Sequence, residues 1–325
     1  MKICFVGAGA LGSAIGGTLA RGGSEVFLVN RNKAHVEAIN RDGLIMREDG
    51  VDHPVKVRAA TDYSEVGVVD LVVVTVKSNF TQVAIEAARS IVGPETMVMS
   101  VQNGLGHEDI LAKVVGKEHL LAGKTYVGGV LLAPGHVIAG VAGKLTYIGE
   151  LDGSISPRVT KVAEEFKRAG VNTIISRNIV GTIWDKLLIN VATGALSGIT
   201  RLPYGGLYQV PEAEATAIAA VSEAMAVAKA QGVVLSIKEP RDAWVMASAG
   251  LPFEFKPSML QSLERGRTTE IDFINGSVVR AGKACGVPTP VNETLVACIK
   301  GIEYQMANFP PATFAAPTPV SSTSR

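Results

Sequence analysis

The chain has 325 residues, which at roughly 150 residues per domain corresponds to about two domains. Hydrophobic residues make up 47% of it and charged residues 19%, enough apolar surface for ordinary globular cores. The formal net charge is +1, so no overall field attracts the protein to nucleic acid or to a membrane surface.

The sequence gives no sign of a membrane anchor, an export signal or a metal site. No segment reaches the ~18 uninterrupted apolar residues of a membrane helix, and glycines break the apolar N-terminal run without a basic leader or cleavage site. The three cysteines, Cys4, Cys285 and Cys298, lie far apart and lack metal-ligand spacing. We interpret them as reduced thiols and expect a cytoplasmic protein without a metal.

Strand and helix patterns alternate through the first part of the chain. The predicted strands are residues 2–6, 25–29, 70–76 and 97–101. The predicted helices are the stretch from the first glycine loop to about residue 21, then 33–41 and 80–90. The run DLVVVTV at 70–76 is continuously apolar, as in a parallel strand buried on both faces. This alternation predicts a doubly wound α/β sheet of the Rossmann type.

The pattern changes after residue 120. Residues 124–130 and 136–148 predict short strands joined by a Pro134-Gly135 turn, and we expect them to add antiparallel strands to the sheet edge. A helix over 158–169 and a strand over 172–176 complete this part.

From Asn178 onward the apolar residues follow a helical period. The predicted helices are 179–196, 212–231, 240–249, 259–285 and 292–309. We therefore predict a nucleotide-binding domain over 1–177 and an all-helical domain over 178–309. Residues 310–325 are rich in proline, serine, threonine and alanine, which predicts a disordered tail.

The loop after the first strand carries a GxGxxG motif, formed by Gly7, Gly9, Ala10, Leu11 and Gly12. In this strand–loop–helix context the first glycine permits a tight turn and the second admits the backbone to a pyrophosphate. The third glycine lets the helix pack on the strand, so that its N-terminus meets the negative charge. The motif predicts a dinucleotide site, and the alternative is a glycine turn without a ligand.

The end of the second strand bears on the choice between NAD and NADP. NAD enzymes usually place an acidic residue there to hold the ribose 2′-hydroxyl. Here Asn30 is uncharged and Arg31 is able to pair with a 2′-phosphate, so we predict NADP(H). The alternative is that Arg31 is an ordinary surface charge.

Hydride transfer to a carbonyl requires a proton donor. All five histidines lie in the first half: His35, His53, His107, His119 and His136. In a two-domain dehydrogenase the second domain supplies much of the chemistry, so a lysine or carboxylate there is the better candidate, with a lysine pKa lowered by burial. Lys186 and Asn190 are four apart in an apolar helix and share a face. The alternative is a surface lysine.

A second polar group follows in the helical half. Ser258 is placed to cap the next helix, and Glu270 lies twelve residues further on, off the same helical face. The two residues border one cleft only if Gly266 breaks the helix between them. The simpler interpretation is a helix cap and a solvated carboxylate.

Taken in order, the motifs resemble those of the ketopantoate reductase (2-dehydropantoate 2-reductase) family. The resemblance extends from Lys2 to about Lys300 and rests on GAGALGS, VTVKS, SVQNGLG, WDKLLIN, SMLQ and TEIDFINGSVVRAGKACGVPTP. It implies that Lys186 is the general acid that protonates the product hydroxyl, while Glu270 orients Lys186 and hydrogen-bonds the substrate. Asn190 and Ser258 would hold the substrate, and Ser258 would bind the substrate carboxylate.

The resemblance also implies a cofactor site and an architecture. Lys77 would contact the ribose and nicotinamide side of NADP(H), and Asn103 would sit near the nicotinamide and help place Lys186. The fold would be a Rossmann domain followed by a helical domain like that of 6-phosphogluconate dehydrogenase, with the active site in the cleft between them. A homodimer that reduces a small 2-oxo acid, ketopantoate, to (R)-pantoate for pantothenate and coenzyme A synthesis is expected.

Three positions depart from the family pattern. Asparagines of well-known members correspond to Gly194, Tyr204 and Phe255 here, all on the substrate side. The proton-transfer residues are retained while the pocket is altered. Reduction of another 2-oxo acid or an imine is therefore the alternative activity, and an NADP(H)-binding regulator is the non-enzymatic one.

Overall fold

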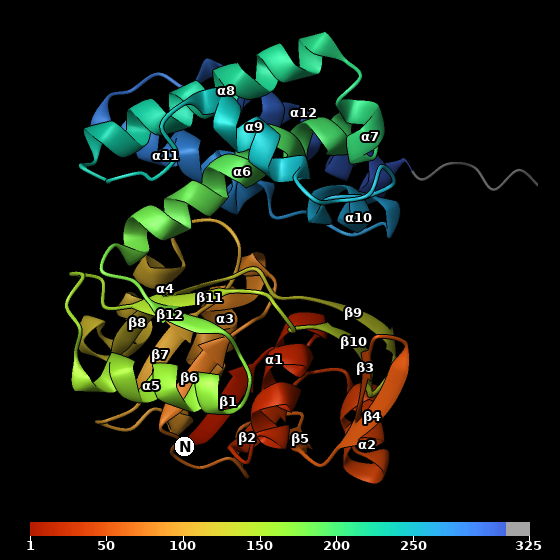
Figure 1. The fold of residues 1–325 in the computed structure, drawn as a ribbon, viewed down its shortest axis with the longest axis vertical. Coiled ribbons are helices and arrows are strands. Elements are labelled where there is room, and N and C mark those ends of the chain that lie inside the picture. The colour runs from red at the N-terminus through yellow and green to blue at the C-terminus, as the bar shows by residue number, and fades with distance from the viewer. Residues whose placement is uncertain (310–325) are drawn as a thin grey trace, which may run out of the picture.

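The computed structural model describes residues 1–309, and the predicted tail over 310–325 lies outside them. Figure 1 shows an α/β half at the bottom and a helical half above it, with the long helix α6 (Ile179–Thr200) running between them. The predicted combination of a parallel-sheet α/β domain and a helical C-terminal region is confirmed.

Eight strands of the described residues form the main sheet, in the order β12-β11-β8-β7-β6-β1-β2-β5. Their bounds are β1 (Lys2–Val6), β2 (Glu25–Val29), β5 (Arg58–Ala60), β6 (Leu71–Val74), β7 (Met97–Ser100), β8 (Leu120–Thr125), β11 (Thr146–Gly149) and β12 (Thr173–Ile175). All neighbouring pairs are parallel except β8 and β11. Side chains of β1 alternate between two cores, Ile3 and Phe5 on one face and Cys4 and Val6 on the other.

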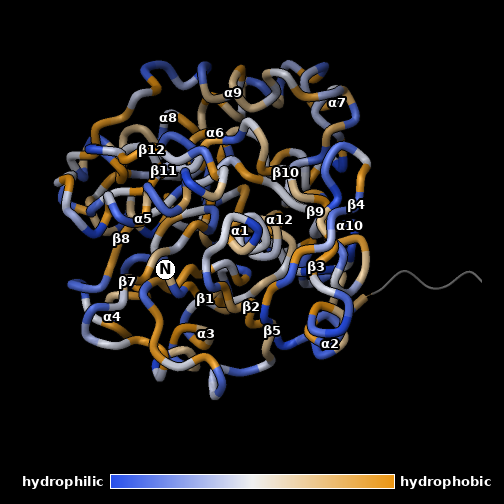
Figure 2. The backbone as a smooth tube through the Cα atoms, turned by 60° about the horizontal axis from the view of Figure 1, so that its bottom comes forward, coloured by the Kyte–Doolittle hydropathy of each residue, from blue (hydrophilic) through white to orange (hydrophobic). Residues whose placement is uncertain are grey.

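Helices cover both faces of this sheet, which explains its continuously apolar strands. Apolar residues of α1 (Ala10–Arg21) and α5 (Pro157–Arg168) join one core, and those of α3 (Thr81–Ala87) and α4 (His107–Val115) join the other. Helix α2 (Lys33–Asp42) lies at the surface and is mostly hydrophilic in Figure 2. Short 3-10 turns are η1 (Ser78–Phe80), η2 (Arg89–Ile91) and η3 (Lys117–His119).

The prediction for the segment after residue 120 is partly wrong. Residues 124–130 divide between β8 and β9 (Gly128–Ala133), and 136–148 divide between β10 (His136–Gly140) and β11. Strands β9 and β10 do not extend the main sheet, because they pair with β3 (Leu44–Glu48) and β4 (Val51–Val55) in a separate four-stranded sheet. Glycines make this possible, since a Cβ on Gly129 would lie 2.7 Å from the Ala10 carbonyl oxygen.

The hairpin β3–β4 was not predicted, although its turn has a sequence signature. Asp49 and Gly50 both have positive φ, 48° and 82°. A two-residue Asp-Gly loop with this geometry matches the right-handed twist of the flanking strands.

The helical half contains α6, α7 (Tyr204–Leu207), α8 (Pro211–Ala230), α9 (Pro240–Ser248), α10 (Ser258–Glu264), α11 (Asn275–Cys285) and α12 (Pro290–Asn308). The single helix predicted over 259–285 is wrong: α10 ends before Gly266, whose φ is +65°, and η4 (Ile271–Phe273) separates it from α11. Helix α6 is long and apolar enough to cross a membrane, but 72% of its most apolar window is buried. It is the central helix of this half's core.

Candidate active site

The glycine loop lies between β1 and α1, at the carboxyl ends of the parallel strands. Gly7 has φ +92°, and a Cβ there would lie 2.3 Å from Val76 Cγ1. A Cβ on Gly12 would lie 2.5 Å from Thr75 Oγ1. Packing against the segment after β6 therefore explains two of the three glycines of the motif.

Gly9 has no such packing reason. Its φ is −80°, and the nearest atom to a Cβ at this position is the Gly7 carbonyl oxygen, 3.9 Å away. Gly9 is the N-cap of α1, and Ala10 and Leu11 form the first turn, where amides have no preceding carbonyl within the helix. A glycine that the protein's own packing does not require is consistent with a close approach of the protein backbone to a ligand such as a pyrophosphate.

The two residues that follow β2, Asn30 and Arg31, have different roles in the structure. The side-chain amide of Asn30 donates to the Ala8 carbonyl oxygen at 2.7 Å, and its Oδ1 accepts from the Asn32 amide at 2.9 Å. Asn30 therefore braces the glycine loop. Arg31 is exposed, with its guanidinium 5.0 Å from the centre of the Phe80 ring. Among the described residues no carboxylate forms an ion pair with Arg31.

Lys186 lies on α6 and reaches toward the sheet half. Its Nζ donates to the main-chain carbonyl of Thr125 at 2.6 Å and lies 5.4 Å from the centre of the Tyr126 ring. Removal from water lowers the pKa of Lys186 to about 8, although the Glu270 carboxylate acts in the opposite direction. Asn190 lies one turn further along α6, and its side chain, like that of Lys186, is partly exposed.

Glu270, which directly precedes η4, also reaches the sheet half. Its Oε1 accepts hydrogen bonds from the Ser78 amide at 3.0 Å and the Ser78 hydroxyl at 2.7 Å. Its Oε2 lies 3.4 Å from Lys77 Nζ. Within residues 1–309 no hydrogen bond or ion pair joins Glu270 to Lys186, so the direct contact implied by the family resemblance is not made here. Lys77, expected at the cofactor, pairs with this carboxylate.

Asn103 follows β7 in the sheet half, and Ser258 begins α10 in the helical half. The Asn103 carbonyl oxygen lies 3.5 Å from the hydroxyl of Ser78, the residue that hydrogen-bonds to Glu270. Among the described residues no hydrogen bond joins Asn103 to Lys186. The prediction that Ser258 caps α10 is wrong, because Pro257 is the N-cap residue and Ser258 is the first residue of the helix. The Ser258 side chain is exposed, and α10, which it begins, ends before the break at Gly266.

Lys124 was not predicted as a site residue, yet it lies beside Lys186. It is only 4% exposed, and its Nζ is 3.5 Å from the centre of the Tyr126 ring and 5.2 Å from that of Tyr147. Burial, and secondarily the charge of Lys186, lowers the pKa of Lys124 to about 7. The one sequence signal was a charged residue inside the apolar run LLAGKT.

The three positions that depart from the family pattern are neighbours in the helical half. A Cβ on Gly194 would meet only Met259, at 3.6 Å. The Tyr204 hydroxyl hydrogen-bonds to Thr193 Oγ1 at 2.9 Å, and its ring lies 5.2 Å from that of Phe255. An aromatic pair therefore stands where the family pattern has amides.

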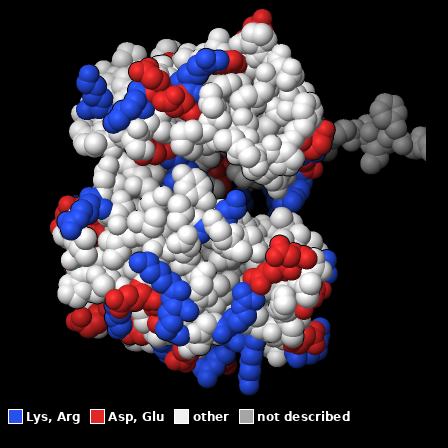
Figure 3. All heavy atoms as spheres, in the orientation of Figure 1, with Lys and Arg blue, Asp and Glu red and all other residues white. Residues whose placement is uncertain are grey.

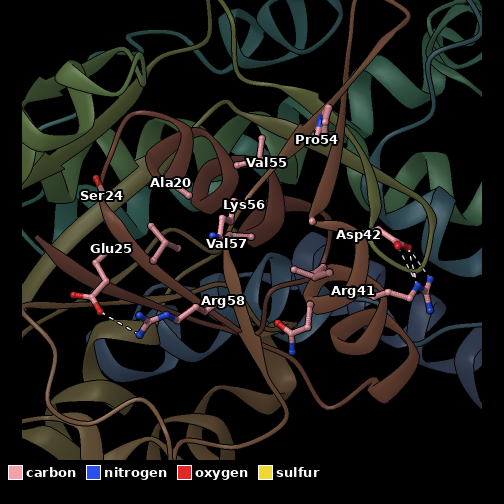
Figure 4. Close-up of a pocket in the computed structure, with 14 residues that line it drawn as sticks. Ala20, Ser24, Glu25, Arg41, Asp42, Pro54, Val55, Lys56, Val57 and Arg58 are labelled. Carbon is pink, nitrogen blue, oxygen red and sulfur yellow. Dashed lines mark hydrogen bonds and ion pairs between the residues drawn. The ribbon is translucent and has the colours of Figure 1, made fainter.

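Figure 3 shows a hollow between the two halves. Hydrogen bonds that join the two halves include those of Lys186 with Thr125 and of Glu270 with Ser78. A separate pocket of about 670 Å³, shown in Figure 4, lies at the amino ends of β2 and β5 near Glu25 and Arg58. Ligands of open α/β sheets bind at the opposite, carboxyl ends. No cluster able to hold a metal occurs in the described part of the chain.

This architecture, with a glycine loop at the carboxyl ends of the strands and a lysine of lowered pKa that joins the two halves, is that of proteins that transfer hydride between a nicotinamide cofactor and a small molecule. The protein is an NAD(P)-dependent oxidoreductase. Residues 3–153 match the family model of ketopantoate reductase PanE/ApbA, and residues 178–303 match that of its C-terminal domain. The chain belongs to the ketopantoate reductase family.

Individual relatives support this membership. The chain is 34% identical to a 2-dehydropantoate 2-reductase of Pyrococcus horikoshii, over 93% of this chain and 98% of the relative. A PanE/ApbA family ketopantoate reductase from Ralstonia eutropha has a similar structure, with a TM-score of 0.86, 37% identity and coverage of 94% and 100%. A ternary structure of D-mandelate dehydrogenase with NADH and anilino(oxo)acetate superimposes with a TM-score of 0.88, at 28% identity and the same coverage.

Proposed function

We propose that the protein is an NADPH-dependent reductase that converts 2-dehydropantoate (ketopantoate) to (R)-pantoate, in pantothenate and coenzyme A synthesis. The observation that carries this proposal is Lys186, an amine of lowered pKa at the cleft between a dinucleotide loop and the helical half. The choice of 2-dehydropantoate as the substrate rests on the relatives named 2-dehydropantoate 2-reductase. The protein would act as a cytoplasmic homodimer, divided into domains at residues 177 and 178.

The cofactor site is assigned to residues of the sheet half. Gly7, Gly9, Ala10, Leu11 and Gly12 would hold the pyrophosphate at the N-terminus of α1. Arg31 would pair with the 2′-phosphate, and Lys77 and Asn103 would border the nicotinamide side. When bound, the nicotinamide supplies the hydride.

The remaining steps fall to the helical half. The Lys186 ammonium would give a proton to the carbonyl oxygen as its charge develops, a role that suits a donor with a pKa close to ambient pH. The Thr125 carbonyl, which accepts from Nζ at 2.6 Å, fixes the direction of the amine. Glu270 would bind the substrate hydroxyl and would also orient Lys186. Asn190 would hold the substrate, and Ser258 would bind the substrate carboxylate.

A specific observation favours a second substrate class. Tyr204 and Phe255 form an aromatic pair, and Gly194 leaves space next to Met259, where amides would favour a small polar substrate. One solved structure of similar fold is a D-mandelate dehydrogenase with an aryl-bearing oxo acid analogue. A 2-oxo acid with a larger apolar side chain, or an imine, is therefore the alternative substrate.

A substrate panel tests both possibilities. Purified protein is assayed for NADPH oxidation with 2-dehydropantoate, 2-oxoisovalerate, phenylglyoxylate and a cyclic imine. We expect the highest kcat/KM with 2-dehydropantoate. A preference for phenylglyoxylate would retain the reductase and replace the substrate, whereas NADPH binding without turnover of any compound would indicate a regulator.

A further inference from the structure

A short hydrogen-bonded chain links a buried histidine to Glu270. His107 Nε2 lies 3.0 Å from Ser78 Oγ, and Ser78 Oγ lies 2.7 Å from Glu270 Oε1. His107 and Ser78 are each only 1% exposed. They belong to the sheet half, at the start of α4 and in η1, whereas Glu270 belongs to the helical half, 192 residues beyond Ser78.

The chain has one consistent direction of donation. An ionised carboxylate only accepts, so the Ser78 hydroxyl donates to Glu270. The histidine must then donate its Nε2 proton to the Ser78 oxygen. Burial lowers the pKa of His107 to about 4, against the opposite effect of Glu270, so the ring is neutral at physiological pH. The structure therefore defines the tautomer that carries its proton on Nε2.

The ring of His107 is itself fixed by the segment that carries Glu270. It stacks on Phe273, with ring centres 5.0 Å apart and planes at 17°. The Leu105 amide donates to the Phe273 carbonyl at 2.9 Å, and Gly104, with φ +98°, allows the approach, since a Cβ there would lie 2.2 Å from that oxygen. The loop before α4 and the turn η4 are thus joined by hydrogen bonds and by stacking.

These contacts distinguish the two oxygens of the carboxylate. Oε1 accepts two hydrogen bonds from Ser78, while Oε2 has only the 3.4 Å contact with Lys77, a side chain that is 54% exposed. The accepting capacity of Oε1 is largely used. Oε2 is the oxygen left to accept a hydrogen bond from the substrate hydroxyl or from Lys186.

We propose that His107 and Ser78 are positioning residues, which orient Glu270 so that Oε2 faces the reacting groups across the cleft. This inference rests on the proposed function of Glu270 as a substrate-binding and lysine-orienting residue. Loss of the Ser78 hydroxyl would remove one of the two hydrogen bonds that hold Oε1, so we expect kcat/KM to fall roughly tenfold.

The test compares Ser78→Ala, His107→Phe, His107→Gln and the double variant S78A/H107F, using the best substrate of the panel. Ser78→Ala is expected to lower kcat/KM for the 2-oxo acid about tenfold, with an unchanged Kd for NADPH. His107→Phe keeps the stacking on Phe273 but removes the donor, so kcat/KM should fall in the same way. His107→Gln retains an N–H donor and should recover part of the loss.

The double variant separates positioning from general destabilisation. If His107 acts through the Ser78 hydroxyl, S78A/H107F should be no slower than Ser78→Ala alone, because effects of residues in one network are not additive. His119→Phe is the matched control, since the His119 ring hydrogen-bonds to the Thr96 carbonyl, at 2.7 Å, and not to Ser78 or Glu270 among the described residues. It should leave kcat/KM unchanged.

Two results would overturn the inference while leaving the reductase assignment intact. One is wild-type kcat/KM in Ser78→Ala and His107→Phe, and the other is a double variant whose losses multiply. A wild-type protein that turns over none of the 2-oxo acids would reject the proposed function, and the positioning role with it.

Discussion

The sheet half and the helical half contribute to one cleft by different physical means. In the sheet half the site is made of backbone: Gly7 and Gly12 are fixed by close packing, and Gly9 leaves its space to a ligand. In the helical half the site is made of long side chains, Lys186 and Glu270, whose ends are held by groups of the sheet half. Binding therefore depends on local backbone geometry, whereas the proton-transfer geometry depends on contacts between distant segments.

The largest expected effect comes from removing the proton donor. Lys186→Ala should lower kcat by ~100-fold or more, the lower end of the range for general acid catalysis. The Kd for NADPH should stay unchanged, because the glycine loop is intact. Stopped-flow reduction and NADPH fluorescence titration measure the two quantities, with Lys167→Ala on the exposed face of α5 as the control. Wild-type turnover would remove Lys186 from its role.

A substitution in the glycine loop should affect NADPH binding without removing a residue that takes part in proton transfer. Gly9→Ala meets no protein atom closer than 3.9 Å, so the fold should be retained, but its Cβ enters the space of the pyrophosphate. We expect the Kd for NADPH to rise at least tenfold, about 1.4 kcal/mol, with an unchanged Tm of the free protein. Gly301→Ala, at a position with no neighbour within 4 Å, is the control. An unchanged Kd would place the dinucleotide elsewhere.

Discrimination between cofactors is expected to be smaller. Arg31 is exposed, so its pairing with a 2′-phosphate should contribute about 1 kcal/mol, or roughly fivefold in affinity. Arg31→Ala should weaken the binding of NADPH by that factor and leave the binding of NADH unaffected. The KM for each cofactor measures both effects. Equal effects on both cofactors would indicate stacking on Phe80 in place of phosphate recognition.

The smallest effect concerns stability. The pKa of Lys124 is lowered to about 7 in the fold, well below the value of a free lysine. Its buried charge is therefore a penalty below pH 7, which is relieved as pH rises toward 10. Lys124→Met should raise the free energy of unfolding by roughly 2 kcal/mol at pH 6, and the gain should shrink at pH 9. Urea unfolding at both pH values, with Lys167→Met as control, measures it. A gain independent of pH would show that packing is responsible.

The same contrast explains what the sequence predicts well. The alternation of strands and helices, the glycine loop and the helical character after residue 178 are local patterns, and the structure confirms them. The separate sheet formed by β3, β4, β9 and β10 was missed because it pairs segments far apart in the sequence, such as His136 of β10 with Ile45 of β3. The break at Gly266 was underestimated because apolar residues continue beyond it.

The site shows the same limit. Spacing places Lys186 and Asn190 on one face of a helix, and the family resemblance selects Glu270. Neither indicates that Glu270 binds Ser78, because that contact joins residues 192 apart in sequence. Lys124 and His107 acquire their properties from burial in the folded protein, which no local pattern records.

The division of labour between the two halves is tested most directly by the pH dependence of kcat/KM for the 2-oxo acid, measured on the wild-type protein with saturating NADPH. Lys186 must be protonated to act as the acid, and its pKa is lowered to about 8. The rate should therefore be constant below this pH and fall tenfold per unit above it. A rate that stays constant to pH 10, or that rises between pH 7 and 9, would contradict a lysine proton donor in the helical half.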